Sequence, residues 1–574
     1  MAVVAGAAIA AGCQSRADRS HDAAAGSNRT TLSHGGAAIA SIRSEPRAFS
    51  RLAAPDSSTE LVSVLTQSRL VRINRVTLDV EPWLAESWSA DADGRRFTIK
   101  LRQGVTFSDG HPFTADDVVF TFRAAYDERT ASALHDSMLV AGKPLDVAAV
   151  DPHTLTLTFP SAFAPGVRIL DNLPIFPKHK LEPMLQAGTL AKAWGLSTPP
   201  AEIVGLGPFV LKEYAPGQRI VLDRNPRYWR KAADGGALPY LDRLTLEVIR
   251  DQNAELLRLT SGQIDFTYTE VPPESYASVK RAAADGIVRL FDLGVSMDPD
   301  SFWFNLKPGA FDGDPRAAWL QKDELRRAIS MAVDRRRFSD TVFFGAGEPV
   351  YLPVTPANKK WYPSDLAPIA HDPAGAKALL ASIGLTDRNG DGTLEDAHGQ
   401  PVRFTLITQA GRPRLERGAA VVKDELAKIG IAMDVATLDP AAVIDAFFVK
   451  KKYEAVYFHA AFSDTDPATT PDFWFSSGGQ HFWNMSQPKP ATDWEKQIDE
   501  LMARQIATPD ERERKRLFAE VLRVFSAHQP VIYFAAPRVY VAVASRVTNV
   551  TPAVYVTPVL WDPDTIAIRH RCPV

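Results

Sequence analysis

Candidate ligand-binding residues gather near residue 460, where an apolar strand pattern runs into an acidic loop. Within the segment 453–467, Asp464 is a carboxylate in an acidic loop, where it could form an ion pair with a cationic group. Such a pair suits a buried site, because the ion pair and its hydrogen bonds offset the desolvation of both charges. Tyr457, His459 and Phe462 precede it and are candidate contacts. The alternative is that Asp464 only caps the turn that follows.

A second set of candidates is mainly aromatic and lies near residue 300. Phe302, Trp303 and Phe304 directly precede Asn305, and aromatic side chains could cover an apolar or sugar-like ligand. The alternative is a place in the core, alternating in and out of a sheet, where only Phe302 and Phe304 share a face. Arg412 could supply a cation for a ligand carboxylate, although the start of a surface helix is the plainer explanation.

Common catalytic motifs are absent from the sequence, which contains no nucleophile elbow, Walker loop, dinucleotide fingerprint or HExxH motif. The common hydrolase, nucleotide-binding and metalloprotease functions therefore lack support, and we expect neither catalysis nor a cofactor. The segment Asp387–Glu395 matches the first half of a calcium-binding loop, but His398 stands where an EF-hand needs a bidentate Glu. We predict a polar hairpin between Leu385 and Phe404 and no metal site, with a low-affinity calcium site as the alternative.

The N-terminal region has the features of a secretory signal. Residues 2–12 are small and apolar, and the segment 9–13 resembles a lipobox, whose cysteine receives lipid and becomes the mature N-terminus. We expect residues 1–35 to comprise the signal and a flexible tether, with Cys13 lipidated. An Ala-rich tail and a bridge from Cys13 to Cys572 are the alternatives.

Length and composition describe an ordinary globular protein. A chain of 574 residues is too long for one core, so we expect two or more lobes. With 45% hydrophobic and 23% charged residues and a net charge of −3, neither disorder nor nucleic-acid binding is favoured. Beyond the N-terminus no apolar run approaches the roughly 20 residues of a membrane-spanning helix.

Strand and helix patterns alternate from residue 37 to the end, which predicts a mixed α/β fold. Alternation of apolar and polar residues predicts strands at 97–101, 155–159, 219–222 and 244–249. Apolar residues at helical spacing predict helices over 325–333, 422–429 and 494–501. Thr114 followed by acidic residues predicts the start of another helix.

Ordered blocks of sequence resemble one known family. Residues 83–88, 97–110 and 112–120 are similar to the signature of solute-binding protein family 5, which includes dipeptide-, oligopeptide- and nickel-binding proteins. Further blocks follow in the order of that family, at residues 177–179, 205–209, 222–229, 238–242, 261–265, 325–335, 425–431 and 530–534. The resemblance covers nearly all of the chain from about residue 40.

The resemblance implies a two-lobed periplasmic-binding-protein fold of class II, in the large cluster C type, with a subdivided first lobe. Lobe I would comprise 36–75, 200–290 and 536–574, with a subdomain at 76–199. Lobe II would comprise 291–535. The chain would pass between lobes near residues 290 and 536, and the lobes would close on a ligand like a hinge.

The same resemblance implies the extracytoplasmic binding component of an ABC importer, which captures a peptide or peptide-like solute between its lobes. Its partners would be the ligand and a permease and ATPase complex, the protein being a monomer that is periplasmic or at the cell surface and held to the membrane by lipid only. Asp464 matches the position that pairs with a peptide amino terminus in the family, and Phe302, Trp303 and Phe304 fall where the second lobe begins. Alternatives are a receptor for an oligosaccharide, nickel or a metal chelate, and a sensor or chaperone on the same fold.

Overall fold

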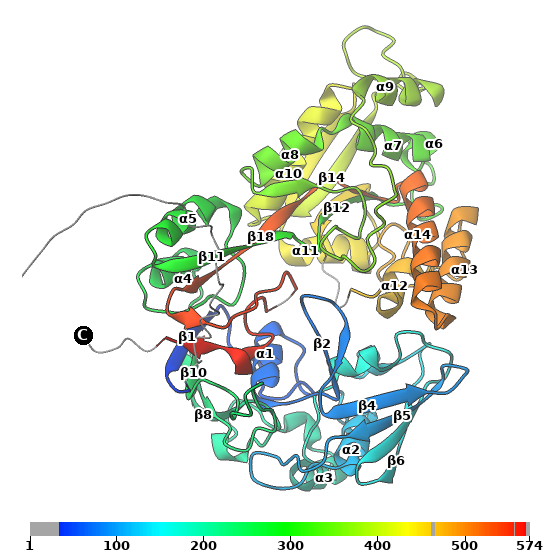
Figure 1. The fold of residues 1–574 in the computed structure, drawn as a ribbon. Coiled ribbons are helices and arrows are strands. Elements are labelled where there is room, and N and C mark those ends of the chain that lie inside the picture. The colour runs from blue at the N-terminus through cyan, green and yellow to red at the C-terminus, as the bar shows by residue number, and fades with distance from the viewer. Residues whose placement is uncertain (1–33, 461–464, 556, 570–574) are drawn as a thin grey trace, which may run out of the picture.

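The computed structural model describes residues 34–460, 465–555 and 557–569. Figure 1 shows an upper lobe, built mainly from the middle of the chain, above a lower lobe built from the N-terminal part. The C-terminal segment returns to the boundary between the two lobes. This is the two-lobed α/β architecture that the sequence predicts.

The core of lobe I is a four-stranded sheet. Its strands follow the order β1 (Ala37–Ile42), β10 (Arg243–Val248), β9 (Arg219–Arg224) and β8 (Phe209–Ala215). The strands predicted at 219–222 and 244–249 are therefore confirmed. β1 pairs with β10 in parallel, whereas the other pairs are antiparallel, and helix α1 (Ser57–Thr66) contacts β8.

The subdomain of lobe I is an antiparallel sheet with helices α2 (Ala115–Tyr126) and α3 (Lys178–Gln186). Its strand order is β4 (Ala85–Ala90), β5 (Arg96–Leu101), β7 (Thr154–Thr158) and β6 (Asp146–Asp151). The predicted strands 97–101 and 155–159 are thus β5 and β7. Helix α2 begins as predicted, and the Asp117 carboxylate accepts a hydrogen bond from the Thr114 backbone N–H at 2.9 Å.

Lobe II is built around a five-stranded sheet. Its strand order is β15 (Ala432–Leu438), β14 (Arg403–Gln409), β16 (Ala455–His459), β12 (Asp300–Phe304) and β17 (Val531–Tyr533). One face packs against helices α7 (Asp323–Ala332), α8 (Arg335–Val342) and α10 (Pro413–Ala427). The other face packs against helices α13 (Asp493–Ala507) and α14 (Glu511–His528). The predicted helices correspond to α7, α10 and α13.

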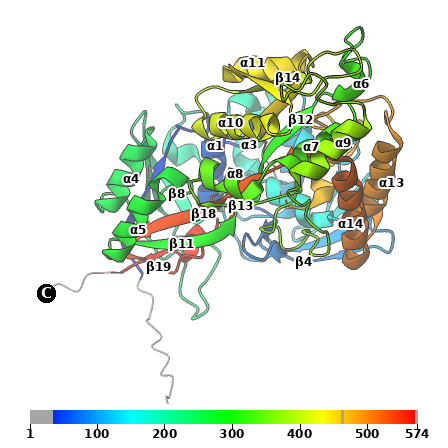
Figure 2. The same cartoon turned by 90° about the horizontal axis from the view of Figure 1, so that it is seen from above.

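Two strands join the lobes. β11 (Val288–Val295) pairs in antiparallel fashion with β18 (Ala535–Ala544), which also pairs with β13 (Gly347–Pro349). Figure 2 shows these strands beside helices α4 (Gln252–Thr260) and α5 (Tyr276–Ala284), with α13 and α14 at the other end of the molecule. The predicted crossings near residues 290 and 536 fall on these strands, and the exact domain boundaries stay predictions.

Further elements complete the described chain. They are β2 (Val71–Ile73), β3 (Val80–Pro82), the 3₁₀ helix η2 (Gly166–Asn172), α4 (Gln252–Thr260), α5 (Tyr276–Ala284), α6 (Ala317–Leu320), α9 (Pro373–Ser382), α11 (Pro440–Ile444), α12 (Pro471–Trp474), β19 (Val547–Thr548) and β20 (Ala567–Ile568). Within the described ranges, none of the helices combines the length and the apolar character needed to cross a membrane.

The lobes also touch each other directly, through hydrogen bonds and an ion pair. The Ala164 backbone N–H donates to the Ile506 carbonyl at 2.7 Å, which ties the subdomain to the end of α13. Arg168 of η2 donates to the Thr465 hydroxyl at 2.9 Å, and Lys360 forms an ion pair with Asp79 at 3.1 Å. Together with β11 and β18, these contacts bring the facing surfaces of the two lobes together.

Candidate functional site

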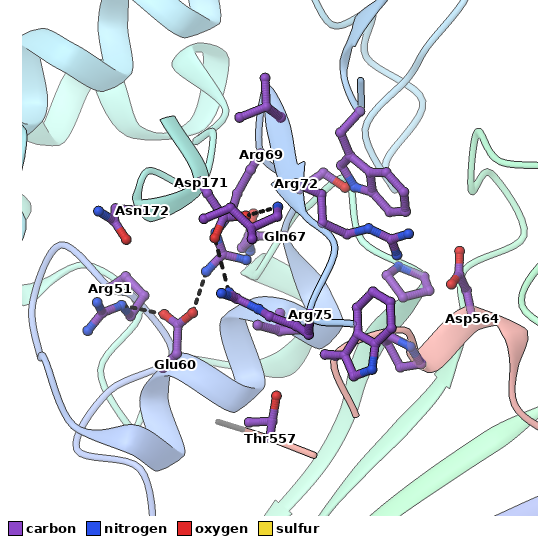
Figure 3. Close-up of a pocket in the computed structure, with 18 of the residues that line it drawn as sticks. Arg51, Glu60, Gln67, Arg69, Arg72, Arg75, Asp171, Asn172, Thr557 and Asp564 are labelled. Atoms are coloured by element: carbon purple, nitrogen blue, oxygen red, sulfur yellow. Dashed lines mark hydrogen bonds and ion pairs between the residues drawn. The ribbon is translucent and has the colours of Figure 1, made fainter. Parts of the chain in front are cut away.

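A cavity of about 240 Å³ lies in lobe I, next to the boundary with lobe II. Its walls come from α1, β2, η2 and the C-terminal segment, so distant parts of the chain converge on it (Figure 3). Its polar and aromatic lining includes Arg51, Glu60, Gln67, Arg69, Arg72, Arg75, Trp83, Asp171, Asn172, Tyr228, Tyr555, Thr557, Trp561 and Asp564.

The charged groups on one side of this cavity are arranged in ion pairs. Glu60 of α1 lies 2.6 Å from Arg51 and 2.5 Å from Arg69. Arg75 pairs with Asp171 of η2 at 3.0 Å, and both sets of contacts are drawn in Figure 3. Each charged group on this wall thus has an ionic partner, although three guanidinium groups share two carboxylates, which leaves one positive charge in excess.

The opposite side of the cavity is a stack of aromatic and guanidinium groups. The guanidinium carbons of Arg72 and Arg230 lie 4.0 and 4.2 Å from the centroid of the Trp83 ring. Arg72 also lies 4.9 Å from the Trp561 ring and forms an ion pair with Asp562 at 2.5 Å. Because these cation–π and ionic contacts fix each other, the wall is preorganised.

Two neighbouring carboxylates at this wall differ in their pKa. Asp564 is buried, and burial raises its pKa, while Tyr228 donates to it at 2.9 Å and Arg230 pairs with it at 2.5 Å. Burial also opposes ionisation of Asp562, but the Arg72 guanidinium holds the pKa of that carboxyl below its ordinary value. Burial and the nearby Asp564 keep the pKa of Tyr228 well above its ordinary value, so its hydroxyl remains a donor.

Gln67 occupies the end of α1 and lines the cavity with an unsatisfied carboxamide. Its side chain is 2% exposed, and neither its Nε2 nor its Oε1 has a hydrogen-bond partner among the residues that the structure describes. Two glycines accommodate this end of the helix. A Cβ on Gly205 would lie 1.9 Å from the Thr66 carbonyl oxygen, and one on Gly207 would lie 2.4 Å from the Thr66 carbonyl carbon. Close backbone packing therefore explains the glycines at 205 and 207.

A smaller cavity, of about 40 Å³, lies mainly in lobe II. Tyr555 lines both cavities, and the Arg75 guanidinium carbon lies 4.5 Å from the centroid of its ring. In this cavity Asn358 donates to the Thr465 carbonyl at 2.8 Å, next to the contact between the lobes. The two cavities thus flank the boundary between the lobes.

The aromatic residues predicted near residue 300 lie in the core instead. Phe302, Trp303 and Phe304 are 0% exposed. Phe302 and Phe304 pack on one face of the sheet, whereas Trp303 packs on the other, in agreement with strand alternation. The Asn305 amide donates to two backbone carbonyls, at residues 451 and 453. The three aromatic side chains therefore form part of the core and do not cover a ligand as expected, and Asn305, a predicted ligand contact, instead holds the neighbouring backbone.

The strand predicted to lead into the site places two candidates around a buried carboxylate. Tyr457 is fully buried, and its hydroxyl lies 3.4 Å from Asp300. His459 Nδ1 lies 3.1 Å from the same carboxylate, and Arg414 pairs with it at 2.8 Å. Burial opposes ionisation of Asp300, but the Arg414 and His459 groups hold the pKa of Asp300 below its ordinary value. Arg412, by contrast, is exposed at the start of α10.

Three predicted residues, Cys13, Phe462 and Asp464, lie outside the described residues, so their roles stay predictions. The neighbouring Asp466 accepts hydrogen bonds from Ala468 and from Arg514, the latter at 2.6 Å in a buried ion pair. The described end of this loop is therefore anchored to α14.

The loop that resembles a calcium site forms the predicted hairpin. Glu395 pairs with Thr386 and Pro401 in antiparallel bridges. Carboxylate oxygens of Asp387, Asp391 and Glu395 lie within 4.8 Å of one another. The Asp387 carboxylate accepts hydrogen bonds from the backbone of the loop, at residues 390 and 392. These internal contacts explain the turn, and calcium binding stays the alternative prediction.

The residues that line the lobe I cavity are not predicted as ligand contacts by the sequence. Trp83 and Tyr228 lie within the blocks that resemble family 5, where they were interpreted only as part of the scaffold. Gln67 and Tyr555 carry no motif, and only their positions in the folded chain place them at the cavity. The signal that could have pointed to the cavity is the combination of Arg72 and Trp83, which form a cation–π contact in the fold.

The fold and this geometry together define the class of protein. Two α/β lobes that are joined by paired strands and meet over a lined cavity are the arrangement by which periplasmic binding proteins close around a ligand. The described chain has two such lobes, which are joined by the pair of β11 and β18, and the lined cavity lies in lobe I next to their boundary.

Comparisons with known proteins specify the family. The family model for "Bacterial extracellular solute-binding proteins, family 5 Middle" matches residues 79–482. A probable ABC transporter-binding protein of Deinococcus radiodurans is 30% identical over 85% of this chain and 85% of its own length. The oligopeptide-binding protein AppA of Bacillus subtilis is 30% identical over 72% of this chain and 70% of its own length. A periplasmic alpha-galactoside-binding protein of Rhizobium meliloti is 26% identical over 86% of this chain and 74% of its own length.

The chain belongs to the family 5 bacterial extracellular solute-binding proteins, and it is a binding component of an ABC transporter, not an enzyme. The structure of B. subtilis AppA in complex with a nonapeptide matches with a TM-score of 0.70 and 25% identity, covering 94% of this chain and all of that chain. The predicted family and fold are therefore confirmed. The relatives differ in the solutes that their names specify, so membership of the family does not decide the ligand of this chain.

Proposed function

We propose that this protein captures a solute between its lobes outside the cytoplasm and, as a monomer, delivers it to a permease and ATPase complex of an ABC importer. The observation that carries this proposal is the pair of cavities that flank the boundary between the lobes and share Tyr555. Closure around a ligand would complete the walls of the larger cavity and exclude water from it.

Native mass spectrometry combined with small-angle scattering tests this function. Gently purified protein should retain a small molecule, and its removal should increase the radius of gyration because the lobes separate. A protein that retains no small molecule, and whose radius stays constant when candidate solutes are added, would contradict the proposal.

A peptide is our first choice of ligand, with Asp464 pairing with its amino terminus. The proposal is supported by the relative AppA, whose name specifies oligopeptides, and by the place of Asp464 after strand β16. Replacing Asp464→Asn keeps the shape of the side chain but removes its charge, which should weaken peptide binding at least a hundredfold. N-acetylation of the peptide should then affect the wild type strongly and the variant little. Calorimetry on both proteins with both peptides measures this; equal affinities for the free peptide would exclude the anchor.

The second candidate is a neutral sugar ligand, favoured by the aromatic wall around Trp83 and by the relative whose name specifies alpha-galactosides.

A further proposal is a lipid anchor at Cys13. Wild-type protein should fractionate with membranes, and Cys13→Ser should release it. Release of both proteins in equal measure would count against the anchor.

A further inference from the structure

The lobe I cavity contains a buried carboxamide whose hydrogen-bonding capacity is unused. Gln67 lines the cavity, is 2% exposed, and has no hydrogen-bond partner for Nε2 or Oε1 among the described residues. A buried polar group without a partner is costly, and native structures satisfy nearly all such groups. An amide that lines a cavity has an evident source for its partner, which is the occupant of that cavity.

The charged residues around Gln67 already have ionic partners. Arg51 and Arg69 lie against Glu60, and Arg75 lies against Asp171. On the other wall, Arg72 lies against Glu81 and Asp562, and Arg230 lies against Asp564. A charged group of a ligand would therefore have to compete with an existing ion pair, whereas a neutral polar group would meet the free carboxamide.

We propose that the lobe I cavity recognises a neutral polar group of the solute that both donates and accepts a hydrogen bond, and that Gln67 is the residue that forms hydrogen bonds with this group. A hydroxyl of a sugar and a backbone amide of a peptide share this chemistry. A carboxamide offers a matching N–H donor and carbonyl acceptor. The aromatic wall of Trp83, Trp561 and Tyr555 completes the cavity by covering the apolar faces of the same group.

This inference rests on the proposed function and specifies the chemistry of one part of its ligand. It is compatible with an ammonium group at Asp464, because in the sequence Asp464 follows strand β16 of lobe II, whereas the cavity belongs to lobe I. In a peptide, the backbone beyond the amino terminus would supply the neutral group. In a sugar, hydroxyls would fill the cavity without any contribution from the anchor.

Calorimetry with two probes and two substitutions at Gln67 tests the inference. The sugar probe is raffinose. The peptide probe is trialanine, which is used both as the free acid and as its C-terminal amide. For whichever probe binds, Gln67→Leu should weaken binding about tenfold, because the hydrogen bonds are lost while the side-chain volume is nearly kept. Gln67→Glu should also weaken binding, since a buried carboxylate would lack a cationic partner. Raffinose binding indicates the sugar source, whereas binding of trialanine and its amide with similar affinity indicates the peptide source.

Gln505 of α13 provides a matched control. It is 0% exposed, and its carboxamide likewise has no hydrogen-bond partner among the described residues. However, it belongs to lobe II and does not line the lobe I cavity. Gln505→Leu should leave probe affinity unchanged, and thermal unfolding should verify that all variants fold.

Three outcomes would overturn the inference. If the Gln67→Leu variant binds the probe as tightly as the wild type, Gln67 does not form hydrogen bonds with the ligand, although the proposed function stands. If Gln67→Glu strengthens trialanine binding, the cavity receives a cation. A wild-type protein that binds neither probe and retains no small molecule in native mass spectrometry would overturn both this inference and the proposed function.

Discussion

At the scale of single residues, the structure separates side chains that hold the protein together from those that face the cavity. Asp300 is buried beneath the end of β16 and is paired with Arg414 and His459. Trp303 is enclosed by aromatic neighbours, with Phe447 and Phe482 at centroid distances of 5.5 and 5.2 Å. Substitutions at both positions should therefore lower the free energy of unfolding.

Replacing Asp300→Asn should lower the stability of lobe II by about 1–3 kcal/mol at neutral pH, because the charge-assisted contacts are lost. The pKa of Asp300 is held below its ordinary value in the folded protein, so its ionisation stabilises the fold above about pH 3.9. That contribution disappears as the pH falls through the folded-state pKa. Urea unfolding from pH 7 to pH 3 should show the wild type converging on the variant. A constant difference across this range would contradict the assignment.

Replacing Trp303→Ala should cost about 3–5 kcal/mol of folding free energy, because it leaves a cavity in the core. Under conditions where the variant remains folded, ligand affinity should change little. Thermal unfolding and calorimetry measure the two effects separately. A large loss of affinity without a loss of stability would restore the interpretation of this tryptophan as a ligand contact.

At the scale of elements, the position of α1 depends on the backbone that it packs against. Gln67 directly follows the last turn of α1 and lines the cavity. Because Gly205 and Gly207 have no side chain, their backbone can pack closely against this end of the helix. The family-like block at residues 205–209 thus acts through geometry, because only a missing Cβ permits these separations.

Replacing Gly207→Ala should destabilise lobe I by about 1–3 kcal/mol and also weaken ligand binding, since the new methyl group would displace α1. The control is Gly195→Ala, where the nearest atom to the new Cβ lies at an ordinary 3.7 Å. Thermal unfolding and ligand calorimetry on both variants make the comparison. Equal behaviour of the two would argue against the role of close packing at residue 207.

At the scale of the whole molecule, affinity depends on how strongly the lobes hold each other. The buried Arg168 guanidinium of lobe I donates both to the Leu78 carbonyl in its own lobe, at 2.8 Å, and to the Thr465 hydroxyl of lobe II. Any contact that forms only in the closed form contributes to ligand affinity through the equilibrium between open and closed forms.

Replacing Thr465→Val keeps the side-chain shape but removes the acceptor for Arg168, which should weaken ligand binding about five- to tenfold through faster release. Thr408→Val is the control, because the buried Thr408 hydroxyl donates within lobe II, to the Tyr457 carbonyl. Stopped-flow release rates measure the effect. If the two variants release ligand equally fast, the contact between the lobes is not part of the closure equilibrium.

From the sequence alone, ordered blocks indicated the family, and the same resemblance implied the crossings near residues 290 and 536. The α/β class and most of the predicted regular elements follow from local information, since strand alternation, helical spacing and turn residues act over a few positions. The alternation at 302–304 even predicted correctly which two side chains share a face.

Only the tertiary structure decided where the cavity lies and which side chains line it. Its walls combine residues as distant as Arg51 and Asp564, and their proximity arises because the C-terminal segment returns to lobe I after the chain has built lobe II. The aromatic residues of β12 have a large apolar surface, which suits a ligand contact and a place in the core equally well. Burial in a sheet covered on both faces, a property of the assembled fold, distinguishes the two roles.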